Sequence, residues 1–475
     1  MQIRQLIGRK PERILLQEAL HSAEAEMVAV IGRRRVGKTF LVTEAYADRI
    51  VFELTGVQRA PLAQQLVNFR DQLAFFSGET PLAEAPADWL SAFSLLRRYV
   101  QNRLGPEKVA LFFDELPWLA NSKSGFLEAL GYFWNSWASR QRLVVVICGS
   151  AASWMIQKVV HDTGGLHNRI TKRIHLQPFT LGETEQFLQA RGLSWDRYSI
   201  LQFYMVTGGI PHYLREAKAG KSPAQNIDQI CFSDSGLLRD EFSKLYPALF
   251  KNAELHTAVI RTLFQKKSGM TRQEILEKLQ HTSGGAITTV LDELEQSGFI
   301  SMYFPYGKKV RDKVWRLTDE YSIFYLQFME DTIIQREHNW LNLMDSHAYK
   351  TWCGFAYENI CLRHLRQIKK ALGISGVYTE ASAFYKKGVA ADPGAQIDLV
   401  LERKDRVINL FEIKYYGEPF YFSADDMAAL RAKQSVFITA TQTRKYLSWV
   451  LITTFGLKNP GMLDNVLTLD DLFGE

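Results

Sequence analysis

The sequence predicts an α/β protein of several domains, the first of which contains a parallel β-sheet. From about residue 27 to residue 214, short apolar runs alternate with longer helical patterns, the order typical of a parallel sheet with crossover helices. The expected strands at 27–31, 51–54, 109–113 and 143–148 are apolar at nearly every position. Strands buried on both faces have this composition, so we expect helices on both sides of the sheet.

Length and composition limit the possible classes of protein. With 475 residues the chain is too long for one ordinary core. It is 47% hydrophobic and 23% charged, as soluble globular proteins are, and no stretch predicts a transmembrane helix or a signal peptide. The four cysteines have no zinc-site or disulfide spacing, so we expect a cytoplasmic protein without membrane contact. The net charge of +6 allows contact with nucleic acid but does not require it.

A glycine-rich loop with the spacing Gly-x-x-x-x-Gly-Lys-Thr directly follows the first expected strand and opens a helix. Backbone N–H groups in such a loop point at phosphate oxygens, Lys38 adds a positive charge, and Thr39 offers a hydroxyl to Mg²⁺. The residues expected to bind nucleotide here are Gly32, Arg33, Arg34, Arg35, Val36, Gly37, Lys38 and Thr39. This loop predicts binding of a nucleoside triphosphate with Mg²⁺, and the lack of a guanine-recognition sequence favours ATP over GTP.

Polar residues end two further strands of the expected sheet. Asp114 and Glu115 follow the strand at 109–113. An aspartate there can hold Mg²⁺, and the adjacent glutamate can polarise the attacking water as a general base. Ser150 follows the strand at 143–148, where its hydroxyl is either a sensor of the γ-phosphate or part of a simple turn.

The middle of the chain has the element order of a winged helix-turn-helix. Helices are expected at 254–264, 271–279 and 285–297, followed by strands at 299–304 and 309–317 and a helix at 321–338. The expected wing, residues 306–316, holds five Lys or Arg and one acid, whereas the expected recognition helix carries Asp292, Glu293 and Glu295 and no basic residue. Two interpretations remain open: contact with DNA through the wing, or a purely structural linker domain.

The last part of the chain offers a separate set of polar residues. Glu358 lies in an expected helix at 351–372, and apolar strands are expected at 397–401, 407–413 and 435–439. Asp398 begins the first of these strands. Glu412 and Lys414 lie on one face of the next, because alternate residues of a strand point the same way. If the two strands are neighbours, three carboxylates and a lysine converge, which suits a Mg²⁺-dependent phosphodiesterase with Asp398 and Glu412 as metal ligands.

The first half of the chain resembles the archaeal-type P-loop ATPases of the AAA+/STAND branch. The resemblance rests on Gly8-Arg9, the arginine-rich loop, Asp114-Glu115, Gly149-Ser150 and the sequence Gly-Gly-Ile-Pro at 208–211. It implies that Arg169 is an arginine finger, that Pro211 belongs to the nucleotide-binding lid, and that the ATPase domain can form a homo-oligomer. The sensor arginine usual in AAA+ lids is not recognisable, so a slow nucleotide switch is as compatible with the sequence as a motor.

The spacing of Glu358, Asp398 and Glu412-x-Lys414 resembles the PD-(D/E)XK nuclease superfamily, whose domain is also found fused to ATPases of the family above. The resemblance implies a restriction-endonuclease-like fold, double-stranded DNA as substrate and catalytic roles for these four residues. The expected domains are therefore a P-loop ATPase core at 1–180, a helical lid at 181–250, a winged helix-turn-helix with a linker helix at 251–340, and a nuclease-like domain at 345–475.

Two functional hypotheses follow. In the first, ATP binding and hydrolysis control a Mg²⁺-dependent DNA nuclease. In the second, the chain is a nucleotide-switched regulatory protein whose nuclease fold is catalytically silent and only binds DNA or a partner. Remodelling of other proteins by an AAA+ ring has less support, because no substrate-gripping pore loop is recognisable.

Overall fold

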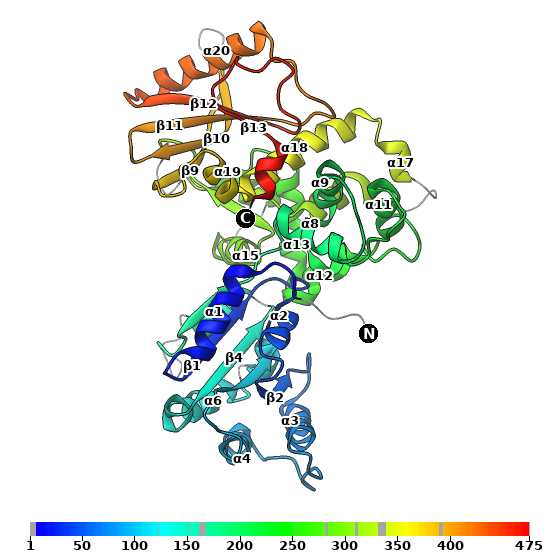
Figure 1. Ribbon diagram of the computed structural model, residues 1–475, viewed down its shortest axis with the longest axis vertical. Coiled ribbons are helices and arrows are strands. Elements are labelled where there is room, and N and C mark those ends of the chain that lie inside the picture. Colours follow the sequence, from blue (N-terminus) through cyan, green and yellow to red (C-terminus); the bar gives the residue numbers. More distant parts are fainter. Residues whose placement is uncertain are drawn as a thin grey trace. The chain divides into compact units, whose positions relative to one another are not determined.

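The computed structural model describes residues 6–121, 123–150, 152–160, 168–250, 252–280, 284–308, 312–330, 339–388 and 393–474. The chain divides into two compact units, Met1–Pro178 and Phe179–Glu475 (Figure 1). Within the described ranges, no helix combines the length and the apolar content needed to cross a membrane. All four cysteines are buried and free.

The first unit contains a five-stranded parallel sheet in the order β2-β3-β4-β1-β5. Its strands are β1 (Glu26–Ile31), β2 (Ile50–Thr55), β3 (Val109–Asp114), β4 (Leu143–Gly149) and β5 (Lys172–His175). Its helices are α1 (Lys10–His21), α2 (Lys38–Ala45), α3 (Leu62–Ser77), α4 (Trp89–Gln101), α5 (Leu116–Leu119), α6 (Phe126–Ser136) and α7 (Ala152–Met155), with short turns η1 (Ala138–Arg140) and η2 (Ile156–Val160). The parallel sheet and the first four strands are confirmed, whereas the short, half-polar β5 was not predicted.

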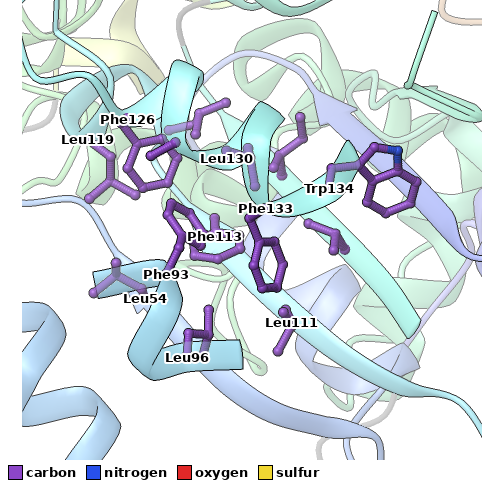
Figure 2. Close-up of a cluster of buried hydrophobic side chains, with 14 of the residues drawn as sticks. Leu54, Phe93, Leu96, Leu111, Phe113, Leu119, Phe126, Leu130, Phe133 and Trp134 are labelled. Carbon is purple, nitrogen blue, oxygen red and sulfur yellow. The ribbon is translucent and has the colours of Figure 1, made fainter. Parts of the chain in front are cut away.

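The core of this unit lies where α3, α4 and α6 cover one face of the sheet. Phe113 of β3 packs against Phe93 and Phe126, with ring centroids 5.7 Å away in each case (Figure 2). β1 and β4 are buried at every residue, as expected for strands covered on both faces. Burial of this aromatic cluster fixes the sheet, and with it the strand ends that carry the polar residues.

The second unit begins with a helical region. Its helices are α8 (Leu181–Ala190), α9 (Arg197–Thr207), α10 (Pro211–Leu214), α11 (Pro223–Cys231) and α12 (Glu241–Leu249). α9 ends at Thr207, and the next two residues, Gly208 and Gly209, have positive φ angles of 61° and 70°. A Cβ atom at Gly209 would lie 2.2 Å from the carbonyl oxygen of Phe179, so this tight turn requires glycine.

A module of three helices and a small sheet follows; we call it the central module. It contains α13 (Ala253–Phe264), β6 (Met270–Thr271), α14 (Arg272–Leu279), α15 (Gly284–Gln296), β7 (Ile300–Tyr303) and β8 (Val314–Leu317), and its sheet order is β6-β8-β7. The expected cap of α14 is present, because Thr271 and Glu274 form a reciprocal capping box. Next come α16 (Glu320–Phe324), η4 (Tyr325–Met329) and α17 (Asn339–Leu343), and residues 331–338 of the expected linker helix lie outside the described ranges.

The C-terminal domain is a second five-stranded sheet with helices beside it. Its elements are α18 (His347–Arg363), α19 (Leu365–Ala371), β9 (Thr379–Lys386), β10 (Ala395–Arg403), β11 (Val407–Lys414), α20 (Ala424–Thr441), β12 (Tyr446–Thr453), β13 (Val466–Leu467) and η5 (Leu469–Phe473). The order is β13-β12-β11-β10-β9, with β9, β10 and β11 antiparallel and β11, β12 and β13 parallel.

The prediction of a strand at residues 435–439 is wrong. Residues 435–439 form the last turns of α20, although Ser-Val-Phe-Ile-Thr has strand-like composition. Ser423 caps the helix in a capping box with Asp426, and the buried side chains of Val436 and Phe437 pack in the core beneath the sheet. Capping and packing therefore outweigh local β propensity, and the strand falls at 446–453 instead.

Candidate functional site

The phosphate-binding loop runs from the carboxyl end of β1 to the start of α2. Gly32 passes so close to the chain that a Cβ atom would lie 2.5 Å from the carbonyl oxygen of Leu176. Arg35 and Gly37 have positive φ angles of 73° and 91°, which curl the loop back before α2 starts at Lys38. The loop therefore aims the N-terminus of α2 at the space above the sheet, the geometry that binds phosphate.

Lys38 and Thr39 are already engaged with residues from other strands. The Lys38 side chain is only 5% exposed, and its Nζ atom donates hydrogen bonds to the Arg33 carbonyl oxygen at 3.0 Å and to Ser150 Oγ at 2.9 Å. Thr39 Oγ1 donates to Asp114 Oδ2 at 2.6 Å. The three strand ends predicted to form the site are thus brought together.

Glu115 completes this group. Its φ angle of 47° turns the chain out of β3, and Ser150 Oγ lies 2.6 Å from Glu115 Oε1. The contact exists because β4 lies between β1 and β3 in the sheet, so the residue after β4 lies between the two other strand ends. Ser150 bonds both the lysine and the glutamate, which favours the sensor interpretation over a simple turn.

Arg9 is part of the loop's support and was not among the predicted site residues. Its side chain is buried, Nη1 donates to the Gln177 carbonyl oxygen at 2.6 Å, and Nη2 donates to the Val36 carbonyl oxygen at 3.1 Å. Arg9 therefore ties the phosphate-binding loop to the segment after β5. The Gly8-Arg9 pair in the sequence was the available signal for it.

The remaining predicted residues of the nucleotide site lie in different environments. Arg33 is buried and Arg34 is exposed. Arg169 is exposed in the segment before β5, and its function as an arginine finger stays a prediction. Pro211 starts α10 in the second unit, directly after the two glycines with positive φ.

The C-terminal sheet brings Asp398 and Glu412 together. In the antiparallel pair β10–β11, Leu399 lies opposite Phe411, which places Asp398 and Glu412 one residue further along on facing strands. Glu412 is 8% exposed and lies between two lysines: Lys414 Nζ is 2.9 Å from Oε1, and Lys433 Nζ is 2.6 Å from Oε2. Lys433 of α20 was not predicted, because nothing in the sequence near it resembles a motif.

The pKa of Asp398 responds to the two other carboxylates. Burial raises the pKa of Asp398 to about 7, and repulsion from Glu358 and then Glu412 contributes to the increase. Glu358 of α18 forms an ion pair with Arg316 of β8 at 2.6 Å. Among the described residues, no three or more His, Cys, Asp or Glu side chains are grouped as a metal cluster.

The expected wing packs against the C-terminal domain at its first residue, Tyr306. The Tyr306 amide donates to the Ala383 carbonyl oxygen at 2.8 Å, and the Tyr306 ring lies 5.0 Å from Phe437. Residues 309–311 of the wing, with two of its five basic side chains, lie outside the described ranges. At Tyr306 the wing is therefore a packing element, which favours the structural interpretation for this part.

Comparison with known proteins supports the assignment of an ATPase domain. Residues 9–217 match the family model described as an ATPase domain predominantly from Archaea, so the chain carries an archaeal-type ATPase domain. An uncharacterized protein of Methanocaldococcus jannaschii is 21% identical over 415 residues, covering 86% of this chain and 87% of that protein.

Two solved structures are also similar. The Walker-type ATPase PABY2304 of Pyrococcus abyssi is 16% identical, covers 68% of this chain and 97% of its own, and has a TM-score of 0.50, so the two share a fold. The ORC2 protein of Aeropyrum pernix, solved as ADPNP-ADP complexes, is 17% identical with a TM-score of 0.43, covering 70% of this chain and 95% of its own.

Proposed function

We propose that this protein is a Mg²⁺-dependent ATPase whose nucleotide state controls a DNA-cleaving site in its C-terminal domain. The observation that carries the second half is the juxtaposition of Asp398, Glu412 and Lys414 on facing strands, with Glu358 on the helix that precedes the sheet. The order of α18, β9, β10, β11, α20 and β12 supports the nuclease-like assignment, and the order of the central module supports a winged helix.

At the nucleotide site each residue has a distinct task. Lys38 exchanges its hydrogen bond with Ser150 for the β- and γ-phosphates. Glu115 orients and deprotonates the attacking water. Thr39 and Asp114 would hold Mg²⁺, and their oxygen atoms, 2.6 Å apart, are the donors that this ion prefers. Magnesium, when bound, offsets the charge on the phosphate oxygens.

At the C-terminal site the donor set also fits a hard cation. Asp398 and Glu412 would hold Mg²⁺ through carboxylate oxygens, and the ion supplies a Lewis acid for the phosphate. Lys414 orients the attacking water and offsets the charge of the scissile phosphate. Lys433, which now shares Glu412 with Lys414, becomes available for a phosphate oxygen when substrate enters.

Plasmid cleavage tests this proposal. The purified chain, incubated with supercoiled plasmid, Mg²⁺ and ATP, should produce nicked or linear DNA. Asp398→Ala and Lys414→Ala should abolish cutting while ATP hydrolysis continues. Cutting that survives both substitutions, or no cutting by the wild type under any nucleotide condition, would contradict the nuclease half.

The alternative is a nucleotide-switched protein that only binds DNA or a partner. It is favoured by one observation: Glu358 and Glu412 are each neutralised by a basic side chain of the chain itself. Fluorescence anisotropy of a labelled duplex separates the two functions. ATP-dependent binding that Glu412→Ala leaves unchanged, together with no cutting, would support the alternative.

A further inference from the structure

Helix α18, which carries Glu358, is tied at two points to one short segment of the chain. Arg316 Nη1 lies 2.6 Å from Glu358 Oε1, and Arg363 Nη1 lies 2.5 Å from Glu320 Oε2. Arg316 and Glu320 belong to the segment that leaves β8 and enters α16; we call residues 316–320 the strap. The strap thus pairs its Arg316 with Glu358 of α18, and its Glu320 with Arg363 of α18.

The cation of the strap is buried and depends on Glu358. Arg316 is 7% exposed, and its Nε and Nη2 atoms have no hydrogen-bond partner in the part of the chain that the structure describes. Its guanidinium lies 4.7 Å from the centre of the Phe355 ring, on the same helix as Glu358. Because a buried charge without a counter-ion is strongly unfavourable, Arg316 holds the Glu358 carboxylate where it lies.

The acid of the strap is buried as well and is held firmly. Glu320 is 2% exposed, and Arg363 is its partner from α18. The preceding residue, Asp319, caps α16 by accepting hydrogen bonds from the amide and the hydroxyl of Ser322. Two ion pairs of opposite sense, one from β8 and one from the capped helix α16, therefore restrain the position of α18 along its axis and its rotation.

We propose that the strap positions the carboxylate site: its pairs with α18 set where Glu358 stands relative to Asp398 and Glu412. This rests on the proposed function of the C-terminal site, and it assigns to Arg316 and Glu320 a positioning role. The central module then affects DNA cleavage by holding α18 in place, whether or not the module itself contacts DNA.

The strap also meets the turn of the helical region. A Cβ atom at Gly208 would lie 2.8 Å from Glu320 Oε2, and Gly208 has a positive φ angle. The turn after α9 therefore closes directly over the carboxylate that holds Arg363. A side chain added at Gly208 would therefore displace Glu320 and, through Arg363, α18.

Metal binding and hydrogen exchange test the strap together. In Arg316→Gln the affinity for Mn²⁺, measured by calorimetry on the full chain, should fall by about 10–100-fold, because Glu358 then no longer keeps its place beside the two metal ligands Asp398 and Glu412. Amides of α18 should exchange faster, whereas those of β11 should not. Arg261→Gln is the control, because it breaks a more exposed arginine–glutamate pair, with Glu330, in which no residue of α18 takes part.

The exchanged pair Arg316→Glu with Glu358→Arg separates positioning from general loss of stability. It should restore the protection of α18 but not Mn²⁺ affinity, because the carboxylate then lies on the strap. Unchanged hydrogen exchange of α18 in Arg316→Gln, or tighter Mn²⁺ binding, would overturn the proposal. The second result would mean that Arg316 weakens metal binding in the wild type.

Asp398→Ala distinguishes failure of the proposed function from failure of the positioning role. If Asp398→Ala leaves Mn²⁺ affinity unchanged, the carboxylate site itself is wrong. If Asp398→Ala abolishes Mn²⁺ binding and Arg316→Gln does not weaken it, the site stands and the strap does not position it.

Discussion

His364, at the end of α18, makes the stability of the second unit depend on pH in a calculable way. The ring is buried, Nε2 accepts a hydrogen bond from the Leu181 amide at 3.0 Å, and Nδ1 donates to the Ile360 carbonyl oxygen at 2.7 Å. Both nitrogens are satisfied only in the neutral ring. Burial accordingly lowers the pKa of His364 from 6.5 to about 4.

The sign and size of the effect follow from linkage. The unfolded chain takes up a proton below about pH 6.5, whereas the folded chain resists it down to about pH 4, so this stability is lost as pH falls through that window. At about pH 5 the difference amounts to about 2 kcal/mol of unfolding free energy. Because a lowered pKa penalises only the protonated state, no further loss from His364 is expected above neutral pH.

The measurement compares the wild type with His364→Gln. Glutamine does not titrate, and its amide oxygen can accept the hydrogen bond from Leu181. Native-state hydrogen exchange of peptides from α8 and α18, corrected for the intrinsic effect of pH, reports the local opening free energy. Between neutral pH and about pH 5 the wild type should lose about 2 kcal/mol more than the variant. Equal losses in the two proteins would mean that His364 is not held neutral, and the reasoning would fail.

Four further outcomes are expected. Lys38→Ala should remove measurable ATP binding in calorimetry, and unchanged affinity would refute the phosphate-binding assignment. Glu115→Gln should keep ATP binding but slow hydrolysis by about 10²–10⁴-fold in a phosphate-release assay; a near-normal rate would exclude it as the base. Gly209→Ala should destabilise the second unit by about 1–3 kcal/mol, because its methyl group meets backbone 2.2 Å away, and an unchanged melting temperature would contradict the tight turn. Phe113→Ala should cost about 3–5 kcal/mol in urea unfolding. The matched change at Phe75, which is 76% exposed, should cost under about 0.5 kcal/mol, and similar losses for both would argue against the core of Figure 2.

The nucleotide site could be predicted because its information is local. Its central residues, Lys38, Asp114 and Ser150, each follow or end an apolar strand, and parallel strands end at one edge of a sheet. These residues therefore had to lie close together once the strands were recognised, and the structure bonds Lys38 to Ser150 and Thr39 to Asp114. The order of the strands in the sheet could not be predicted from the apolar runs. That order brings Ser150 within hydrogen-bond distance of both Lys38 and Glu115.

The partners that hold the sites in place were not predictable from one sequence. Arg316 and Glu358 are 42 residues apart, and Lys433 reaches Glu412 from a helix whose last turns read as a strand. Arg9 supports a loop 27 residues away through a single backbone oxygen. No spacing rule marks such contacts, because they depend on how whole elements pack and not on the period of one element.

Both candidate sites have their polar groups paired with groups of the chain itself. Lys38 holds Ser150, Ser150 holds Glu115, and at the other site Glu412 holds two lysines. A ligand at these sites therefore replaces existing hydrogen bonds and ion pairs. Its net binding free energy is smaller than the number of its contacts suggests. The exchange also has a consequence for control: when phosphate takes Lys38, Ser150 loses one partner and its bond to Glu115 is free to change. Under the proposed function, Ser150 connects occupancy of the loop with the orientation of Glu115, so a nucleotide switch can begin within the sheet itself.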